Sequence, residues 1–395
     1  MAYRMATRED PAGRLAQRLP PVISWVEEAN RQLTICNACR YCESYCPVFP
    51  ALERKSVLTD TTVIALANLC HDCQACYQAC MYVPPHEFAV DLPTALTAVR
   101  QESYARFAWP SRVARWFQHE NWSALGLGGF ALVVFAASLT FTGGWAHFFR
   151  SDAGPGSFYK VIPFFAMLIP ALAGGAFIVA VLWGGFLNFW RTSGASFRDL
   201  ADWRAWTEAT SSALRLTHMR GGGDGCYYPD RLQTSNARRV LHSMVVWGFV
   251  GTLISTTLAA IWQDILHQTP PFPVWSAPVL FGIAGGVGLI VGTSGLINLK
   301  LNATRDRPVA TMRSMDFAFL VTLDAVAVSG MLTLILRNSA LLNASLYVHI
   351  ACLFALYVTA PYGKFVHFVY RFAAILLDVV ERNGSPEVIP LTEGT

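Results

Sequence analysis

The stretch "ICNACRYCESYCPVFP" (residues 35–50) carries Cys36, Cys39, Cys42 and Cys46, and Pro47 follows the last of them. The stretch "LCHDCQACYQACMYVPP" (residues 69–85) repeats the spacing with Cys70, Cys73, Cys76 and Cys80. This C-x2-C-x2-C-x3-C spacing is the bacterial ferredoxin pattern, in which three cysteines bind one cluster and the fourth binds the other. We therefore expect two [4Fe–4S] clusters, one on Cys36, Cys39, Cys42 and Cys80 and one on Cys70, Cys73, Cys76 and Cys46.

Clustered cysteines also occur in zinc sites and in disulfide-bonded domains. A structural zinc site usually shows two CxxC pairs separated by a longer loop, with four ligands for each ion. Disulfides suit exported domains, whereas "MAYRMATREDPAGRLAQRLP" at the N-terminus has no apolar core or cleavage site of a signal peptide. Clustered thiols in a reducing compartment favour metal binding. The iron–sulfur interpretation is therefore preferred, although Met81 rather than proline follows Cys80.

The composition is typical of an integral membrane protein with a polar part attached. Hydrophobic residues make up 53% of the 395 residues, charged residues make up 14%, and the mean hydropathy is +0.37. The net charge of +4 is spread over many loops, which does not suggest nucleic-acid binding. Apolar runs of ~20 residues or more predict membrane-spanning helices. Six such runs cover residues 124–145, 160–190, 240–263, 276–299, 317–336 and 345–370.

These features predict a mainly α fold, in which an N-terminal bacterial-ferredoxin-like (helical) module with two [4Fe–4S] clusters precedes a six-helix transmembrane bundle. We assign residues 1–121 to the module, residues 122–376 to the bundle with a loop at 191–239, and residues 377–395 to a tail. Lysine and arginine gather before the first span, in the loop 191–239 and between spans four and five. The positive-inside rule therefore predicts a multi-pass protein of the bacterial cytoplasmic membrane, with the module and both termini in the cytoplasm.

Three histidines fall within the predicted spans, where polar side chains are costly and usually functional. His349 and His367 are 18 residues apart in span six. On one continuous helix they would share a face about five turns and ~27 Å apart, near opposite leaflets. His242 in span three shares the cytoplasmic half with His367, and this pair is the preferred bis-histidine ligand set of a b-type haem. Arg238 and Arg239, one turn from His242, would pair with the haem propionates.

Other polar residues in the spans leave alternatives open. His349 would bind a second haem, with His147 and His267 as candidate partners. The three span histidines would otherwise be interfacial or hydrogen-bonded to a neighbouring helix. Asp324, in the middle of span five, would serve a proton path or a quinone pocket, or form a structural hydrogen bond to another helix.

Several residues near the cysteine motifs or in the loop 191–239 carry weaker signals. The glycine-rich stretch "RGGGDGCYYPD" (residues 220–230) lacks the context of a nucleotide fingerprint and is expected to form a tight turn or a partner contact. Cys226 within it is expected to be an ordinary loop thiol, and His218 a polar loop residue. His71 lies beside the clusters and is expected to pack or tune rather than ligate.

The quoted cysteine motifs with their flanks, together with "GGGDGCYYPD" and "PYGKFVHFVYRFAA", resemble the tricarballylate (citrate/tricarballylate) utilization protein B family over roughly residues 25–380. The resemblance implies an iron–sulfur and haem membrane protein that reoxidises a separate FAD-dependent dehydrogenase, which converts tricarballylate to cis-aconitate, and passes the electrons to the quinone pool. A related domain occurs in an oxygenase of cobalamin biosynthesis. The sequence departs from the expected pattern at "LHS" (241–243), where a histidine pair is expected in relatives.

The sequence therefore predicts an electron-transfer protein with no organic-substrate catalysis of its own. Electrons would pass from an FAD-dependent dehydrogenase of the tricarballylate type through two [4Fe–4S] clusters and b-type haem to membrane quinone. One alternative is an iron–sulfur/haem membrane subunit of another respiratory complex, of the heterodisulfide- or nitrate-reductase type. A second alternative is a redox-sensing membrane protein or transporter that the clusters regulate.

Overall fold

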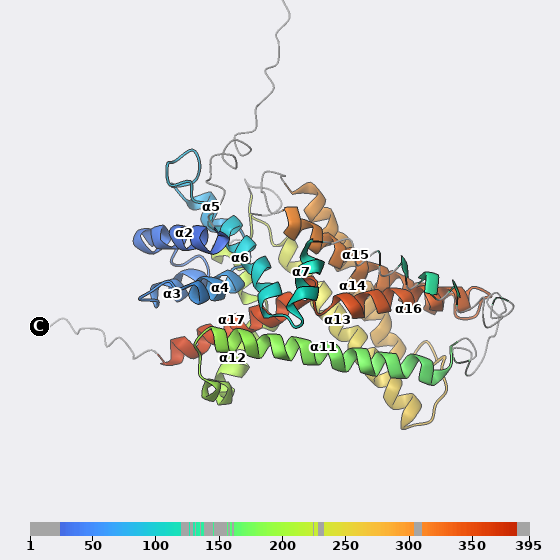
Figure 1. Ribbon diagram of the computed structural model, residues 1–395. Helices are drawn as coiled ribbons and strands as arrows, with labels where there is room; N and C mark the ends of the chain where they lie inside the picture. The colour runs from blue at the N-terminus through green and yellow to red at the C-terminus, as the bar shows by residue number, and fades with distance from the viewer. Residues whose placement is uncertain are drawn as a thin grey trace, which may run out of the picture.

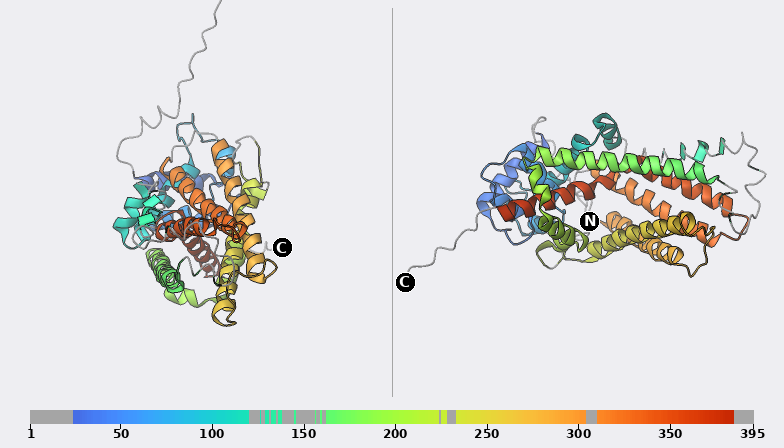
Figure 2. Two further views of the ribbon diagram at one scale, coloured as in Figure 1. Left: turned by 90° about the vertical axis from the view of Figure 1, so that its right-hand side faces the viewer. Right: turned by 90° about the horizontal axis from the view of Figure 1, so that it is seen from below.

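The computed structural model describes residues 24–119, 162–223, 225–227, 233–303 and 310–384, with isolated positions between 126 and 159. Within these ranges the protein is helical, and one isolated β-bridge joins Cys226 to Ser235. Short helices form a head at one end, and long helices run away from it as a bundle (Figure 1). Figure 2 shows the same elongated arrangement from two further directions. The mainly α fold class is confirmed.

The head contains the helices α2 (Trp25–Cys39), α3 (Val48–Glu53), α4 (Asp60–Leu69), α5 (Ala75–Ala79), α6 (Leu92–Phe107) and α7 (Ser111–His119). Side-chain caps fix where they begin. Ser24 and Glu27 form a capping box at α2, Thr59 caps α4 and Asp91 caps α6. α2 ends after Cys39 because Arg40 takes the left-handed conformation, with φ of 56°.

Five helices within the described ranges are long and apolar enough to cross a membrane. They are α11 (Phe164–Thr192), α13 (Ala237–Asp264), α14 (Ala277–Asn302), α15 (Ala310–Ile335) and α16 (Leu342–Thr359). Their positions match predicted spans two to five and the first part of span six. Predicted span one, at 124–145, falls largely outside the described residues. Between α11 and α13 the chain forms η1 (Phe197–Ala201), α12 (Trp203–Leu214) and η2 (Thr217–Gly223).

Glycines let α13 and α14 approach each other closely. A Cβ on Gly248 would lie 2.7 Å from the backbone nitrogen of Leu289, and a Cβ on Gly285 would lie 2.7 Å from that of Thr252. Small residues at helix crossings are a common means of association in membranes, where apolar burial between helices gives little driving force. This crossing fixes the direction of α13, the helix that carries His242.

The prediction of one continuous sixth span over 345–370 is wrong. α16 ends at Thr359, the chain turns through Pro361 and Gly363, and η3 (Lys364–Val366) leads into a separate helix, α17 (His367–Gly384). Pro361 cannot continue a helix, because it lacks an N–H and its ring clashes with the preceding turn. His349 and His367 therefore lie on different helices, and they do not share one helix face.

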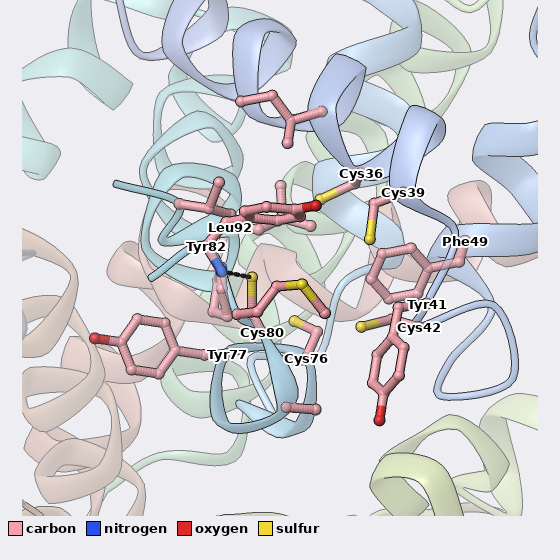
Figure 3. A pocket seen from close by; sticks show the side chains of 15 residues that line it. Cys36, Cys39, Tyr41, Cys42, Phe49, Cys76, Tyr77, Cys80, Tyr82 and Leu92 are labelled. Carbon is pink, nitrogen blue, oxygen red and sulfur yellow. Dashed lines mark hydrogen bonds between the residues drawn. The ribbon is translucent and has the colours of Figure 1, made fainter. Parts of the chain in front are cut away.

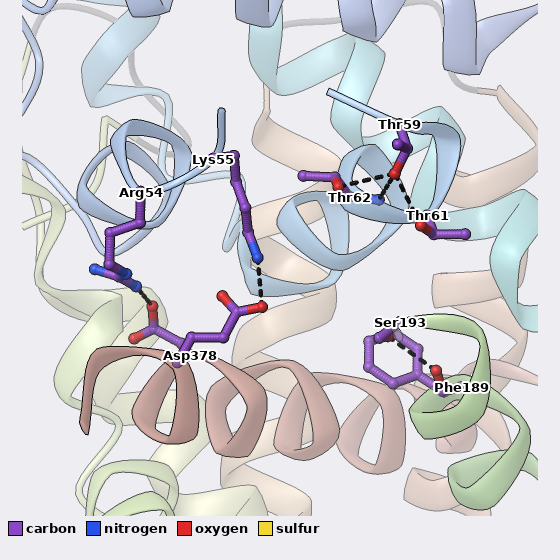
Figure 4. Close-up of polar contacts among 9 residues, drawn as sticks. Arg54, Lys55, Thr59, Thr61, Thr62, Phe189, Ser193 and Asp378 are labelled. Atoms are coloured by element: carbon purple, nitrogen blue, oxygen red, sulfur yellow. Dashed lines mark hydrogen bonds and ion pairs between the residues drawn. The ribbon is translucent and has the colours of Figure 1, made fainter. Parts of the chain in front are cut away.

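α17 packs into the head rather than continuing through the bundle. It lies against α4, α11 and α12, and residues 377–384, which the sequence analysis assigns to a tail, complete it. Arg54 and Lys55, just after α3, form ion pairs with Asp378 and Glu381 (Figure 4). These long-range pairs tie α17 to the helices that follow the first cysteine motif.

One apolar core joins the head, α17 and the near end of α11. Tyr104 of α6 and Tyr370 of α17 stack with ring centroids 5.7 Å apart, and each is only 2% exposed. Phe189 and Trp190 of α11 are fully buried in the same core. Because aromatic burial of this kind contributes strongly to packing, the head is held in a fixed position on the bundle.

Candidate redox centre

Both cysteine motifs lie in the head, where helix ends and turns present their thiols. The first motif spans the last turn of α2, the turn after it and the residue before the N-cap of α3. The second spans the loop from the end of α4 to the end of α5. Short helices joined by tight turns bring the sulfur atoms of each motif towards those of the other.

Five thiols from both motifs line one pocket (Figure 3), and we call four of them the outer group: Cys36, Cys39, Cys42 and Cys80. Cys39 is exposed. Burial, followed by the nearby thiols of Cys80, Cys42 and Cys39, raises the pKa of Cys36 to about 12. Cys80 of the second motif thus lies among the first three cysteines of the first motif.

The other four thiols lie deeper, and we call them the inner group: Cys46, Cys70, Cys73 and Cys76. Burial raises the pKa of Cys46 well above its ordinary value, and the neighbouring thiols of Cys70 and Cys73 add to the rise. Cys76 also lines the outer pocket, but after burial its pKa is raised most by the thiols of the inner group. The outer and inner groups are the two ligand sets that the sequence spacing predicts, and cluster ligation by them stays a prediction.

The donor sets suit four-iron clusters. The backbone N–H of Asp72 donates to Cys70 Sγ, and that of Tyr82 donates to Cys80 Sγ, each at 3.4 Å. Such N–H···S bonds are typical of cluster ligands and help to set cluster potentials. In the described part of the chain, no three His, Cys, Asp or Glu side chains converge as they would on a single ion. A cluster binds each thiolate to a different iron, so its ligands stand further apart than those of one zinc ion.

The glycine-rich stretch of the loop 191–239 covers the inner group. The N–H of Tyr227 donates to the carbonyl oxygen of Cys73 at 3.0 Å. A Cβ on Gly221 would lie 3.5 Å from Cys73 Sγ, and Gly225 has a φ of +111° with Ser235 oxygen 2.8 Å from where its Cβ would be. The described residues of this stretch, 220–223 and 225–227, therefore pack against the inner group. Cys226, expected to be an ordinary loop thiol, is 1% exposed beside Cys73.

His242 and His367 face each other, with ring centroids 6.2 Å apart and ring planes at 84°. His367 Nδ1 lies 2.6 Å from the carbonyl oxygen of Lys364, which leaves Nε2 as its nitrogen with a lone pair to offer a metal. In the part of the chain that the structure describes, His242 Nδ1 is buried without a hydrogen-bond partner. Two buried imidazoles on different helices, one with an unsatisfied nitrogen, fit the donor set of a bis-histidine metal site.

The two arginines predicted to pair with propionates make other contacts. Arg238 Nη1 donates to the carbonyl oxygen of Asp72 at 2.8 Å, next to the inner group. Arg239 Nη2 donates to the carbonyl oxygen of Arg215 at 3.4 Å, on the exposed side of α13. A role of either residue towards a haem stays a prediction.

Sequence reasoning did not place Arg100, Arg371 or His218 beside the inner group. Arg100 of α6 and Arg371 of α17 both donate to the carbonyl oxygen of Cys70, Arg371 at 2.6 Å. His71 and His218 have ring centroids 5.9 Å apart, although His218 was expected to be a polar loop residue. Arg100 lies 30 residues and Arg371 lies 301 residues from Cys70 in the sequence, so local spacing gave no signal for either.

His349 and Asp324 lie deeper in the bundle and contact neighbouring helices. His349 Nδ1 is 3.1 Å from Ser329 Oγ of α15, and its ring packs against Gly330. Asp324 accepts a hydrogen bond of 2.5 Å from Thr293 Oγ1 of α14. This contact of Asp324 matches the expected alternative of a structural hydrogen bond to another helix, and a proton path or quinone pocket at Asp324 stays a prediction. Binding roles for both residues stay predictions.

Comparison with known proteins gives matches to both parts of the chain. The profile of "Citrate utilization protein B" matches residues 119–386, and that of "Citrate utilization protein B Fer4-like domain" matches residues 29–106. The chain belongs to the citrate utilization protein B family. A curated Citrate utilization protein B from Escherichia coli is 33% identical over 363 residues, which cover 90% of this chain and 92% of that protein. No solved structure matches the chain.

Family membership confirms the resemblance drawn from the cysteine motifs. The Fer4-like match covers α2 to α6, the helices that hold both cysteine groups, and it indicates an iron–sulfur domain at this end of the chain. The second match covers the helices long and apolar enough to span a membrane. The chain is thus a membrane protein of a citrate utilization family with an iron–sulfur-type head.

Proposed function

We propose that this chain is a membrane electron-transfer protein that accepts electrons from a reduced FAD-dependent dehydrogenase, of the tricarballylate type, and delivers them to membrane quinone. The outer and inner groups would each hold a [4Fe–4S] cluster, and His242 and His367 would hold a b-type haem. When bound, these groups supply one-electron carriers between a two-electron flavin and a two-electron quinone. The chain's own residues position the carriers and shield them from water.

The observation that carries the proposal is the order of the three sites. The outer group includes the exposed Cys39, the inner group is covered by the loop 191–239, and the facing pair of His242 and His367 lies beyond it at the start of the bundle. Arg371 contacts Cys70 of the inner group from one turn after His367. The order runs from a solvent-accessible entry in the head to the end of a membrane helix.

The separation of His242 and His367 supports a shared metal between them. Metal–imidazole bonds are ~2 Å long, so two such bonds and two ring radii occupy about the 6.2 Å between the ring centroids. The exposed surface around Cys39 would receive the flavoprotein, because electron-transfer partners use small interfaces that bring their cofactors near the surface. Tyr41 and Met81, exposed by 60% and 63%, border that surface.

Substitution of the two histidines tests the haem assignment. We expect His242→Ala and His367→Ala each to lose b-type haem, since one remaining imidazole cannot hold the iron in its bis-histidine state. Iron and acid-labile sulfide of the two clusters should stay, because the two histidines contact each other and Lys364 and belong to neither cysteine group. Haem and iron quantitation of purified full-length protein measures both. Unchanged haem content in both variants would refute the assignment, and His86→Ala, in the head but away from the bundle, is the matched control.

A further inference from the structure

Three arginines converge on one short stretch of backbone beside the inner group. Arg100 from α6 and Arg371 from α17 donate to the carbonyl oxygen of Cys70, and Arg238 from α13 donates to that of Asp72 at 2.8 Å. The arginines come from three helices that are far apart in the sequence. The contacts of Arg100 and Arg371 with this stretch are to a carbonyl oxygen, which carries no net charge, so the positive charge of these two guanidinium groups stays available to act on a neighbouring group.

Two of these charges are poorly compensated by the protein itself. Arg100 is 5% exposed, and the Nε atoms of both Arg100 and Arg371 are buried without a hydrogen-bond partner among the described residues. Within the described ranges, neither forms an ion pair with a carboxylate, and burial followed by the charge of Arg100 lowers the pKa of Arg371 to about 9. Buried cations are stable only beside negative charge. A cluster bound through four thiolates at the inner group would supply it.

No positively charged side chain lines the pocket of the outer group. The residues lining its pocket are cysteines and apolar or aromatic side chains, with no lysine, arginine or histidine among them. Arg40, next in sequence to Cys39, is exposed and its Nε donates to the carbonyl oxygen of Asn37 at 3.2 Å. Solvent screens an exposed charge far more than a buried one.

We propose that Arg100 and Arg371 raise the reduction potential of the inner cluster above that of the outer cluster, and so direct electrons inward. The inference rests on the proposed function, since it requires both clusters. Each reduction adds one electron, hence one negative charge, to a cluster. Burial alone opposes that added charge, whereas nearby buried cations favour it, and cluster potentials follow net charge and hydrogen bonding in this way.

The backbone contacts of Arg238 and Arg371 place the inner cluster next to the histidine pair. Arg238 is one turn before His242 on α13, and Arg371 is one turn after His367 on α17. Both helices are therefore fastened to the Cys70–Asp72 stretch within one turn of their histidine. The cluster made easier to reduce is the one that passes electrons on.

The test is a redox titration of the full-length protein in detergent, followed by EPR, for the wild type, Arg371→Gln and Arg371→Lys. Cys39→Ser, which alters the outer group alone, assigns the two cluster signals. In Arg371→Gln we expect the midpoint potential of the inner cluster to fall while that of the outer cluster stays. The equilibrium ratio of reduced inner to reduced outer cluster should drop at least tenfold, which corresponds to 59 mV for one electron. Arg371→Lys keeps the charge and should retain most of the wild-type difference.

A purely structural role would give a different result. In that case Arg371→Lys, which loses the guanidinium fork, would fail as fully as Arg371→Gln. Arg382→Gln is the matched control, because Arg382 lies on the same helix but is 48% exposed and paired with Glu208. Equal shifts of both clusters, or no shift in Arg371→Gln, would overturn the inference, and Arg100→Gln serves if Arg371→Gln does not fold. A wild type without two cluster signals would instead contradict the proposed function.

Discussion

At the scale of single residues, the two cysteine groups differ in accessibility, and this difference predicts different outcomes for substitution. Cys39→Ser should remove or alter the outer cluster signal alone, because Cys39 is exposed at the rim of its pocket. Cys73→Ser should remove the inner cluster and also reduce folded protein, because Cys73 is 9% exposed and its side chain packs with Cys226 of the covering loop. Iron and labile-sulfide content with EPR measures both. Loss of both signals in Cys39→Ser would contradict the grouping, and Cys352→Ala in α16 is the control.

The cysteine pattern could be interpreted from sequence because ligand spacing within each motif is local. The residues around it could not, since they come from distant segments. Arg371 reaches Cys70 across 301 positions, and Cys226 becomes buried only when the glycine-rich stretch folds over Cys73. His242 and His367 were paired from predicted membrane depth, and their facing rings are consistent with that reasoning. Arg238 is predicted to pair with a haem propionate, but in the structure it donates a hydrogen bond to the backbone of the head.

At the scale of helices, the crossing of α13 and α14 depends on Gly285. In Gly285→Ala, the added Cβ would meet backbone atoms of Thr252 and Gly248 at 2.7 and 2.8 Å, which cannot move aside as a flexible side chain would. Gly175→Ala on α11 is the matched control, because a Cβ there meets no described residue within 4 Å. Both variants gain the same helix propensity, so their difference isolates the clash. We expect Gly285→Ala to be less stable by about 1–3 kcal/mol, measured by thermal unfolding in detergent, and equal melting temperatures would contradict the close crossing.

Helix existence was predictable from apolar runs, whereas the end of α16 was missed. The apolar character of residues 345–370 suggested one span, but Pro361 and Gly363 interrupt it. Those two residues were the available signal, because proline and glycine mark helix ends more strongly than hydropathy does. The consequence is large: α17 turns into the head, where Tyr370 and Leu376 are buried. His367 thereby lies at the boundary between the head and the bundle.

At the scale of the whole molecule, the head, α17 and the near end of α11 share one core, so the cysteine groups and the histidine pair are held in fixed positions. Fixed positions suit electron transfer, which requires close and constant spacing of carriers and little conformational change. The bundle adds helices long and apolar enough to reach across a membrane. The chain as a whole is therefore suited to connect a water-soluble donor with an acceptor dissolved in lipid.

The most direct test of this account follows electrons through the purified full-length protein. The anaerobic protein is reduced with dithionite, freed of excess reductant and mixed rapidly with a short-chain ubiquinone analogue, while haem absorbance, cluster EPR and quinol formation are recorded. We predict that the reduced haem and cluster signals disappear together as quinol forms, and that His367→Ala, with its clusters intact, forms quinol far more slowly. A protein whose reduced clusters and haem persist in the presence of quinone would contradict the account.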